Sequence, residues 1–210
     1  MRIVVFGASG RTGRLIVAGG PERGHEVTAF TRTPETLGGL ASRCTRVVRG
    51  DIVDRVVVAE AVAGQQGAIY AIGPEPGEPG EQAADGLLRV VRVMQTYGSR
   101  RLIVLSATGA AEAAVASRSF LARLFRPRHA AAAEPGDLRR MEVTVRQSGL
   151  AWTLVRPSRL TDAPATGAFR AGPGHSLPDA KPIARADVAT YVLDQLETEL
   201  NVQHAVALSG

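Results

Sequence analysis

The chain has 210 residues, of which 45% are hydrophobic and 21% are charged, and its formal net charge is +5. This length suits one domain with a substantial core and is short for two, so we expect a single domain over residues 1–210. No apolar run approaches the ~20 residues of a membrane-spanning helix. Met1 and Arg2 lead directly into an apolar strand without a signal-peptide pattern, which predicts a cytoplasmic protein.

The cysteine and the basic residues exclude several kinds of site. The chain has one cysteine, Cys44, which cannot form an internal disulfide or a cysteine cluster for a metal. We expect Cys44 to be a small buried hydrophobic residue at the start of a strand. Lys181 is the only lysine among 25 basic residues, so a mechanism that needs lysine must use it. The arginines are scattered without interleaved aromatics, which favours anionic ligands over nucleic acid. We expect a small-molecule acceptor as partner, and no membrane. The sequence does not distinguish between a monomer and a dimer as the oligomeric state.

The chain begins with the order strand, glycine turn, helix. Ile3 to Phe6 predict a buried strand, three glycines follow at spacings of three, and apolar residues then open a helix. A dinucleotide site requires this order, because the first glycine permits a tight turn, the second lets the backbone approach a pyrophosphate, and the third lets the helix pack on the strand. The helix N-terminus then faces the phosphates. The alternative is an ordinary structural turn. The glycines are Gly7, Gly10 and Gly13.

The second strand, over residues 24–32, indicates the type of cofactor. A site for NAD would place an acidic residue just after this strand, where it bonds the ribose 2′-hydroxyl. This chain has Thr31 and Arg32 instead, and a guanidinium suits a 2′-phosphate. We therefore predict NADP, with NADPH preferred over NADH; a solvated arginine at a strand end is the alternative. Pro34 then opens a short helical turn.

The third and fourth strands are expected over residues 46–52 and 68–72. Asp51 follows the third strand on the ligand side of the sheet, where it could bond the amine of an adenine or cap a helix over residues 54–63. The Pro/Gly-rich stretch 73–80 predicts a loop over the nicotinamide half of the cofactor.

The middle of the chain contains a candidate catalytic hydroxyl. Helical periodicity over residues 81–97 leads into a strand over 101–106, and Ser106 sits where that strand ends. Its hydroxyl could hold a substrate carbonyl or the nicotinamide amide, or cap a turn. Residues 109–136, alanine-rich with a basic amphipathic part, predict either a lid over the substrate site or, alternatively, a mobile surface insertion or partner-binding helix.

The last third completes an alternating α/β pattern. We expect a helix over residues 137–147, a strand over 150–157, a Gly/Pro-rich substrate loop over 158–182, a helix over 187–196 capped near its start, and a strand over 204–208. Strands alternating with helices predict a doubly wound, mostly parallel sheet with helices on both faces, here with a small substrate lobe formed by the late loops.

With these residues assembled, the chain resembles the atypical short-chain dehydrogenase/reductases, in the NAD(P)-binding, NmrA-like group that includes biliverdin reductase B, a flavin reductase. The resemblance covers nearly the whole length. It rests on residues 7–13, 31–32, 50–51, 148–157, 160–167 and 183–189.

The resemblance implies a Rossmann fold that binds NADP, with roles for particular residues. The pyrophosphate would lie on the glycine turn, the 2′-phosphate at the end of the second strand, and the nicotinamide among later residues. The implied cofactor residues are Gly7, Ser9, Gly10, Arg11, Thr12, Gly13, Thr31, Arg32, Asp51, Ile52, Ile72, Gly73, Ser106, Arg156, Pro157 and Ser158. Glu142 matches an acidic helix position common in the family, and the motif around Arg185 and Asp187 is expected to join the last helix to the core.

The departures from the family concern the reaction. Typical short-chain reductases use a Tyr-x-x-x-Lys pair, in which lysine lowers the pKa of the tyrosine that protonates the substrate. None of the three tyrosines, Tyr70, Tyr97 and Tyr191, has a lysine four residues later. Histidines of biliverdin reductase B are replaced at Glu142 and Arg159. Flavin reduction stays open, because hydride transfer to a flavin needs stacking over the nicotinamide more than a dedicated acid.

The sequence therefore supports two candidate functions. The first is an NADPH-dependent oxidoreductase that passes hydride to a flavin-like, quinone or carbonyl acceptor, with Ser106 as a hydrogen-bond donor and Arg156 or Arg159 stabilising negative charge on the acceptor. The second is a non-catalytic NADP-binding sensor or regulatory protein. The candidate catalytic residues are Ser106 and Arg159, and no metal site is expected.

Overall fold

The computed structural model describes residues 1–73, 81–106 and 135–210. The interpretations of residues 74–80 and 107–134 lie outside the described residues. In chain order, the elements within the described ranges are β1 (Arg2–Phe6), α1 (Arg11–Glu22), β2 (Glu26–Thr31), the 3-10 segment η1 (Pro34–Arg43), β3 (Arg46–Arg49), α2 (Arg55–Val62), β4 (Gly67–Tyr70), α3 (Glu81–Tyr97), β5 (Arg101–Leu105), α6 (Pro135–Arg146), β6 (Ala151–Pro157), β7 (Leu160–Thr161), β8 (Arg170–Pro173), β9 (Ile183–Ala184), α7 (Arg185–Glu197) and β10 (His204–Ser209).

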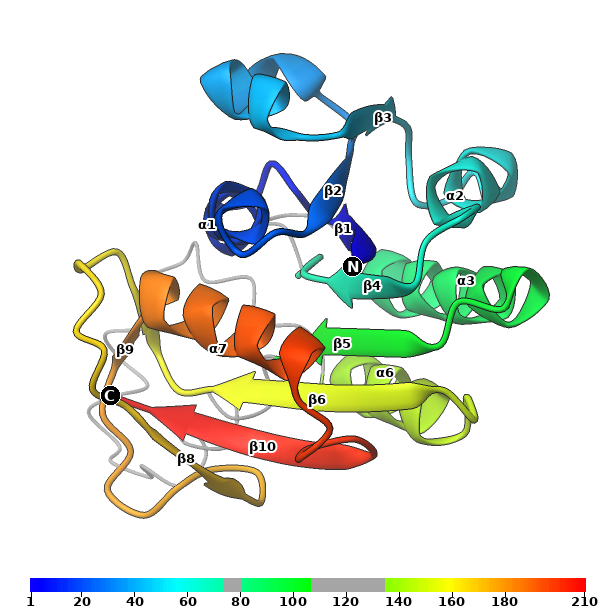
Figure 1. Ribbon diagram of the computed structural model, residues 1–210. Coiled ribbons are helices and arrows are strands. Elements are labelled where there is room, and N and C mark those ends of the chain that lie inside the picture. Colours follow the sequence, from blue (N-terminus) through cyan, green and yellow to red (C-terminus); the bar gives the residue numbers. More distant parts are fainter. Residues whose placement is uncertain (74–80, 107–134) are drawn as a thin grey trace, which may run out of the picture.

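Strand β1 explains why the sheet needs helices on both of its faces. Its four apolar residues are fully buried, and successive side chains of a strand point to opposite faces. Val4 and Phe6 accordingly join one hydrophobic cluster, with residues of α2, α3 and α6. Ile3 and Val5 join the other cluster, with residues of α1 and α7. The helices thus form a layer on each side of the sheet (Figure 1).

The main sheet has eight strands in the order β3-β2-β1-β4-β5-β6-β10-β8. Neighbouring strands are parallel, except that β8 runs antiparallel to β10 at one edge. Strands β7 and β9 form a separate two-stranded parallel sheet. The predicted doubly wound α/β fold is confirmed.

The strand order reverses direction next to β1, and this reversal positions the site. The chain moves outward from β1 through β2 to β3, then returns to place β4 on the other side of β1. In open α/β sheets, the crevice outside the carboxyl ends of two such strands is where ligands bind. The glycine turn follows β1, and Ala71 to Gly73 follow β4, so both segments border this crevice.

Several local predictions were wrong in detail. Residues 158–182 contain the short strands β7 and β8, where a loop was expected. Cys44 ends η1 and precedes β3, and it is only half-buried. Asp54, and not Asp51, caps α2, because its carboxylate accepts hydrogen bonds from the backbone N–H groups of Val56 and Val57.

The last helix also begins differently from the prediction. Helix α7 starts at Arg185, two residues early, and Ala184 at its N-cap position offers no capping side chain. Asp187 instead turns to the segment after β7, where its buried carboxylate accepts hydrogen bonds from the N–H groups of Thr166 and Gly167 and from the Thr166 hydroxyl. This carboxylate therefore ties an exposed segment to α7, whereas the motif was expected to join the last helix to the core.

Replacing Asp187 with alanine is expected to lower the free energy of unfolding by about 1–3 kcal/mol at neutral pH, because the hydrogen bonds that Thr166 and Gly167 donate to this buried carboxylate are lost. Burial raises the pKa of Asp187, but its hydrogen bonds outweigh this effect and hold the pKa below the ordinary 3.8. The stabilisation is therefore complete above pH about 4 and is lost as the pH falls through the depressed value. Urea unfolding of both proteins at pH 7 and pH 3 tests this. A difference between them that grows on acidification would contradict it.

Candidate functional site

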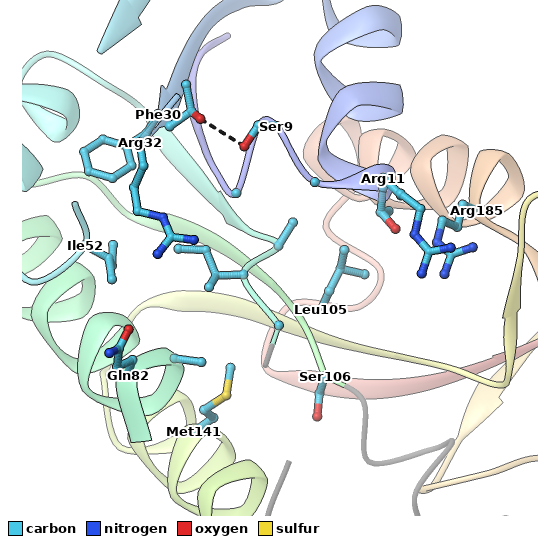
Figure 2. A pocket seen from close by; sticks show the side chains of 18 of the residues that line it. Ser9, Arg11, Phe30, Arg32, Ile52, Gln82, Leu105, Ser106, Met141 and Arg185 are labelled. Carbon is cyan, nitrogen blue, oxygen red and sulfur yellow. Dashed lines mark hydrogen bonds between the residues drawn. The ribbon is translucent and has the colours of Figure 1, made fainter. Parts of the chain in front are cut away.

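A cavity of about 830 Å³ opens at the carboxyl ends of the central strands (Figure 2). It runs across the strand-order reversal, from the end of β3 to the end of β6. The lining residues are Gly7, Ser9, Gly10, Arg11, Thr12, Phe30, Thr31, Arg32, Thr33, Gly50, Asp51, Ile52, Ala71, Ile72, Gly73, Gln82, Ala83, Leu105, Ser106, Leu138, Met141, Pro157, Leu160, Arg185 and Val188.

The glycine turn lies so close to its neighbours that side chains cannot be added. Gly7 has φ of +82°, and a Cβ there would lie 2.9 Å from the Ala71 carbonyl group. A Cβ on Gly13 would lie 2.0 Å from the Gly7 carbonyl oxygen. Gly13 is thus the contact between α1 and the turn, and it does not line the cavity. Helix α1 begins at Arg11 without a side-chain cap or an acidic residue in its first turn, so its N-terminus suits an anion.

The end of β2 places a cation at one side of the cavity. Figure 2 shows the Arg32 side chain extending from the strand end into the cavity. Next to it, the Thr31 hydroxyl donates to Ser9 Oγ over 2.9 Å, which fixes the strand end against the glycine turn. Asp51 and Ile52 line the same side, where the Asp51 carboxylate accepts from the N–H of Val53. A guanidinium, hydroxyls and a carboxylate therefore gather at this end.

The end of β5 places Ser106 over a buried ion pair. Arg156 is 2% exposed and donates two hydrogen bonds to Glu142 of α6, through Nε over 2.8 Å and through Nη2. Its Nη1 donates to the Gly174 carbonyl over 2.7 Å. Ser106 Oγ in turn donates to Glu142 Oε1 over 3.3 Å. Because the hydroxyl proton points at this carboxylate, Ser106 would contact a ligand through the lone pairs of its oxygen, as a hydrogen-bond acceptor.

The tyrosines of the chain all lie in described ranges, and none of them lines the cavity. Tyr70 is fully buried and donates to the Ala83 carbonyl, and burial raises its pKa well above the ordinary value. Burial, with the charge of Asp194, raises the pKa of Tyr191 to about 12. Tyr97 is exposed at the far end of α3. The described part of the cavity thus holds no tyrosine that could act as the proton donor of a typical short-chain reductase.

The cavity brings together most of the cofactor residues predicted from the sequence and leaves four predicted residues outside. Gly13 packs on the turn, and Arg156 is held by Glu142 beneath Ser106. Ser158 is buried, and its hydroxyl donates to the carbonyl of Lys181. Arg159, a candidate catalytic residue, is exposed and does not line the cavity.

Sequence reasoning missed part of the lining. The apolar wall includes Leu138 and Met141 of α6, and Leu160 and Val188 beyond β6. Arg185 was expected only to join the last helix to the core, yet it lines the cavity. Its Nη1 donates to Asp162 over 2.7 Å, and the same carboxylate accepts from Arg11 over 3.0 Å. For the lining residues of α6, the helical periodicity of residues 137–147 is the sequence pattern that could have indicated them.

The described residues contain neither a cluster of metal ligands nor a membrane-spanning helix. Residues 1–73, 81–106 and 135–210 contain no group of three or more metal-ligating side chains. Within the same part of the chain, no helix has the length and apolar character needed to cross a membrane.

Comparisons with known proteins agree with this geometry. A family model described as NAD(P)H-binding matches residues 7–199. A (4-alkanoyl-5-oxo-2,5-dihydrofuran-3-yl)methyl phosphate reductase from Streptomyces griseus is 29% identical over 99% of this chain and 67% of its own length. Among solved structures, an NAD-dependent epimerase/dehydratase from Bacillus halodurans superposes with a TM-score of 0.82 at 22% identity, covering 100% of this chain and 94% of that one. A short-chain dehydrogenase/reductase from Veillonella parvula in complex with NADP gives 0.79 at 17% identity, covering 100% and 94%. Identities this low show a shared fold.

Proposed function

This chain belongs to the NAD(P)H-binding family, as its sequence resemblance predicted, and we propose that it is an NADPH-dependent oxidoreductase that passes hydride to a flavin-like, quinone or carbonyl acceptor. One observation carries the proposal: a cation after β2, the helix N-terminus after β1 and a buried hydroxyl after β5 line a single cavity, as a bound dinucleotide requires. The reductase name of the Streptomyces griseus relative supports the reaction class.

The residues of the cavity divide among the parts of the cofactor. The first N–H groups of α1, around Arg11 and Thr12, suit the pyrophosphate. Arg32 suits the 2′-phosphate, because a guanidinium can bind it with two charge-assisted hydrogen bonds. Ile52 and Asp51 would border the adenine, and Ile72 and Gly73 the nicotinamide half.

Ser106 would orient the nicotinamide end. Since its proton is donated to Glu142, its oxygen can accept a hydrogen bond from a carboxamide N–H group or from a hydroxyl of the acceptor. When bound, the reduced nicotinamide supplies the hydride. The protein then positions the two rings, and the proton comes from solvent, since no tyrosine of the chain lines the described cavity.

Replacing Arg32 with glutamine is expected to raise the dissociation constant for NADPH roughly 10- to 100-fold, the effect of about 1.5–3 kcal/mol for hydrogen bonds to a charged group. The dissociation constant for NADH should change little, because NADH lacks the 2′-phosphate. Titration of each cofactor, followed by its fluorescence, measures both values. Arg49→Gln is the matched control, since Arg49 is an exposed arginine at the end of β3 that pairs with Glu35 outside the cavity lining. Equal losses for both cofactors would remove Arg32 from the 2′-phosphate site.

The second candidate function is a non-catalytic NADP-binding sensor. The observation that favours it is the position of the tyrosines and of Lys181 outside the cavity lining. Oxidation of NADPH with a panel of flavins, quinones and aldehydes separates the two functions. Turnover with any class of acceptor supports the reductase, whereas tight NADPH binding without turnover across the panel supports the sensor.

A further inference from the structure

Two arginines from different helices meet on one carboxylate at the edge of the cavity. Arg11 opens α1 and Arg185 opens α7, and their guanidinium groups lie 3.0 Å and 2.7 Å from the two carboxylate oxygens of Asp162. The side chain of Arg185 is 11% exposed, whereas those of Arg11 and Asp162 are 71% and 63% exposed. Figure 2 shows the two arginines side by side, on the opposite side of the cavity from Arg32.

The charges at this point do not balance. Two guanidiniums share one carboxylate, which leaves one positive charge. Helix α7 also begins here, and its N-cap residue, Ala184, supplies no capping side chain. The N-terminus of α7 adds partial positive charge. The group that would complete this arrangement is an anion.

Asp162 can be exchanged for such an anion at little cost. It lies in the segment after β7 with its side chain 63% exposed, and its pair with the exposed Arg11 contributes about 0–1 kcal/mol. Arg185 is held more rigidly, because it lies at the start of a helix and is mostly buried. A ligand oxyanion that displaces the carboxylate would gain two guanidinium partners and lose little.

The surroundings indicate which molecule carries the anion. The lining that Ser106 and the two arginines share also includes the apolar side chains of Leu105, Leu160 and Val188. Beyond the arginines, a hollow of about 410 Å³ continues toward the surface, lined by Arg11, Arg185 and Asp162 among others. Since Arg32 on the other side suits the cofactor's 2′-phosphate, the arginine pair is available to the acceptor. A molecule with an apolar ring and an anionic tail fits this side.

We propose that Arg11 and Arg185 form a binding site for a phosphate or carboxylate group on the acceptor, with Asp162 as the internal group that this anion displaces. The proposal rests on the proposed function, because it assigns the other end of the cavity to NADP. It makes the substrate class an apolar, ring-containing acceptor that carries an oxyanion. Arg185 is then a specificity-determining residue.

The test uses two flavins that share one ring system and differ by a phosphate. Binding of FMN and of riboflavin to the full chain saturated with NADP is followed by quenching of flavin fluorescence. Arg185→Gln is expected to weaken FMN binding at least tenfold and to leave riboflavin binding unchanged. Arg11→Gln should have a smaller effect of the same kind, because its side chain is exposed. Asp162→Asn should strengthen FMN binding several-fold, since the competing carboxylate is gone. Arg43→Gln, which alters an exposed arginine paired with Glu22, should change neither flavin.

The same experiment separates the alternatives. If Arg185→Gln weakens NADP binding and leaves the preference for FMN over riboflavin unchanged, the arginines serve the cofactor and the proposal is overturned. A second matched pair, 4-carboxybenzaldehyde and benzaldehyde, covers an acceptor that is not a flavin; a wild-type protein that prefers the charged member of neither pair also overturns it. Binding requires no turnover, so a phosphate-dependent preference without NADPH oxidation would refute the reductase function and leave the anion site standing.

Discussion

Substitution of alanine for Gly13 is expected to abolish tight binding of NADP. The added Cβ would lie 2.0 Å from the Gly7 carbonyl oxygen, whereas ordinary contacts of a Cβ begin at 3.4 Å. The turn must therefore move by more than an ångström relative to α1. That movement misaligns the N–H groups that would face the pyrophosphate. Loss of two charge-assisted hydrogen bonds, at about 1.5–3 kcal/mol each, corresponds to a fall in affinity of at least roughly 100-fold.

Calorimetric titration with NADP measures the affinity, and thermal unfolding of the same variant shows how much of the loss is structural. Gly39→Ala is the matched control, because a Cβ at Gly39 meets no atom within 4 Å. It should bind NADP as the unaltered protein does. Wild-type affinity in the Gly13→Ala protein would mean that the turn does not form the pyrophosphate site.

The largest effect on stability is expected from breaking the buried ion pair beneath Ser106. Replacing Arg156 with methionine removes the cation that donates two hydrogen bonds to Glu142, while the carboxylate stays buried. Breaking a buried pair in this way costs about 3–5 kcal/mol. Urea unfolding should therefore show a marked fall in the midpoint of the Arg156→Met variant.

The double variant distinguishes loss of a charge partner from loss of packing. Replacing both members of a buried pair with apolar residues is often neutral, so Arg156→Met with Glu142→Met should be more stable than Arg156→Met alone. If the double variant is less stable than Arg156→Met and than Glu142→Met, the ion pair stabilises the fold by more than the compensation of one charge by the other. The exposed pair of Arg43 and Glu22 is the control, and Arg43→Met should cost less than about 1 kcal/mol.

The sequence predicted one half of the candidate site well. Gly7 to Thr12, Arg32 and Ser106 follow strands directly, and residues that follow parallel strands meet at the same edge of the sheet, whatever the details of packing. The order of strands and helices could be predicted for the same reason, since the apolar run in β1 requires cover on both faces.

The other half depends on packing that the sequence does not encode locally. Leu138 and Met141 line the cavity because α6 has one particular rotation about its axis. Arg185 reaches the cavity because α7 packs beside α1 and brings two distant N-termini together. Arg156 follows the alternation of β6, in which Leu154 and Val155 belong to opposite clusters, so its side chain points to the α6 face and to Glu142. Such contacts between distant segments decide which charged residues face a ligand.

The only lysine of the chain, Lys181, provides a site for chemical labelling on one face of the molecule. Lys181 is exposed and lies outside the cavity lining, and its backbone is fastened by the hydroxyl groups of Ser158 and Ser209. An amine-directed fluorophore would therefore attach at this side chain and at the chain's amino group, without modifying the arginines around the cavity. Because Lys181 stands two residues before β9, which pairs with the strand that precedes Asp162, a dye there would report on the side of the cavity that holds Arg11 and Arg185 as ligands bind.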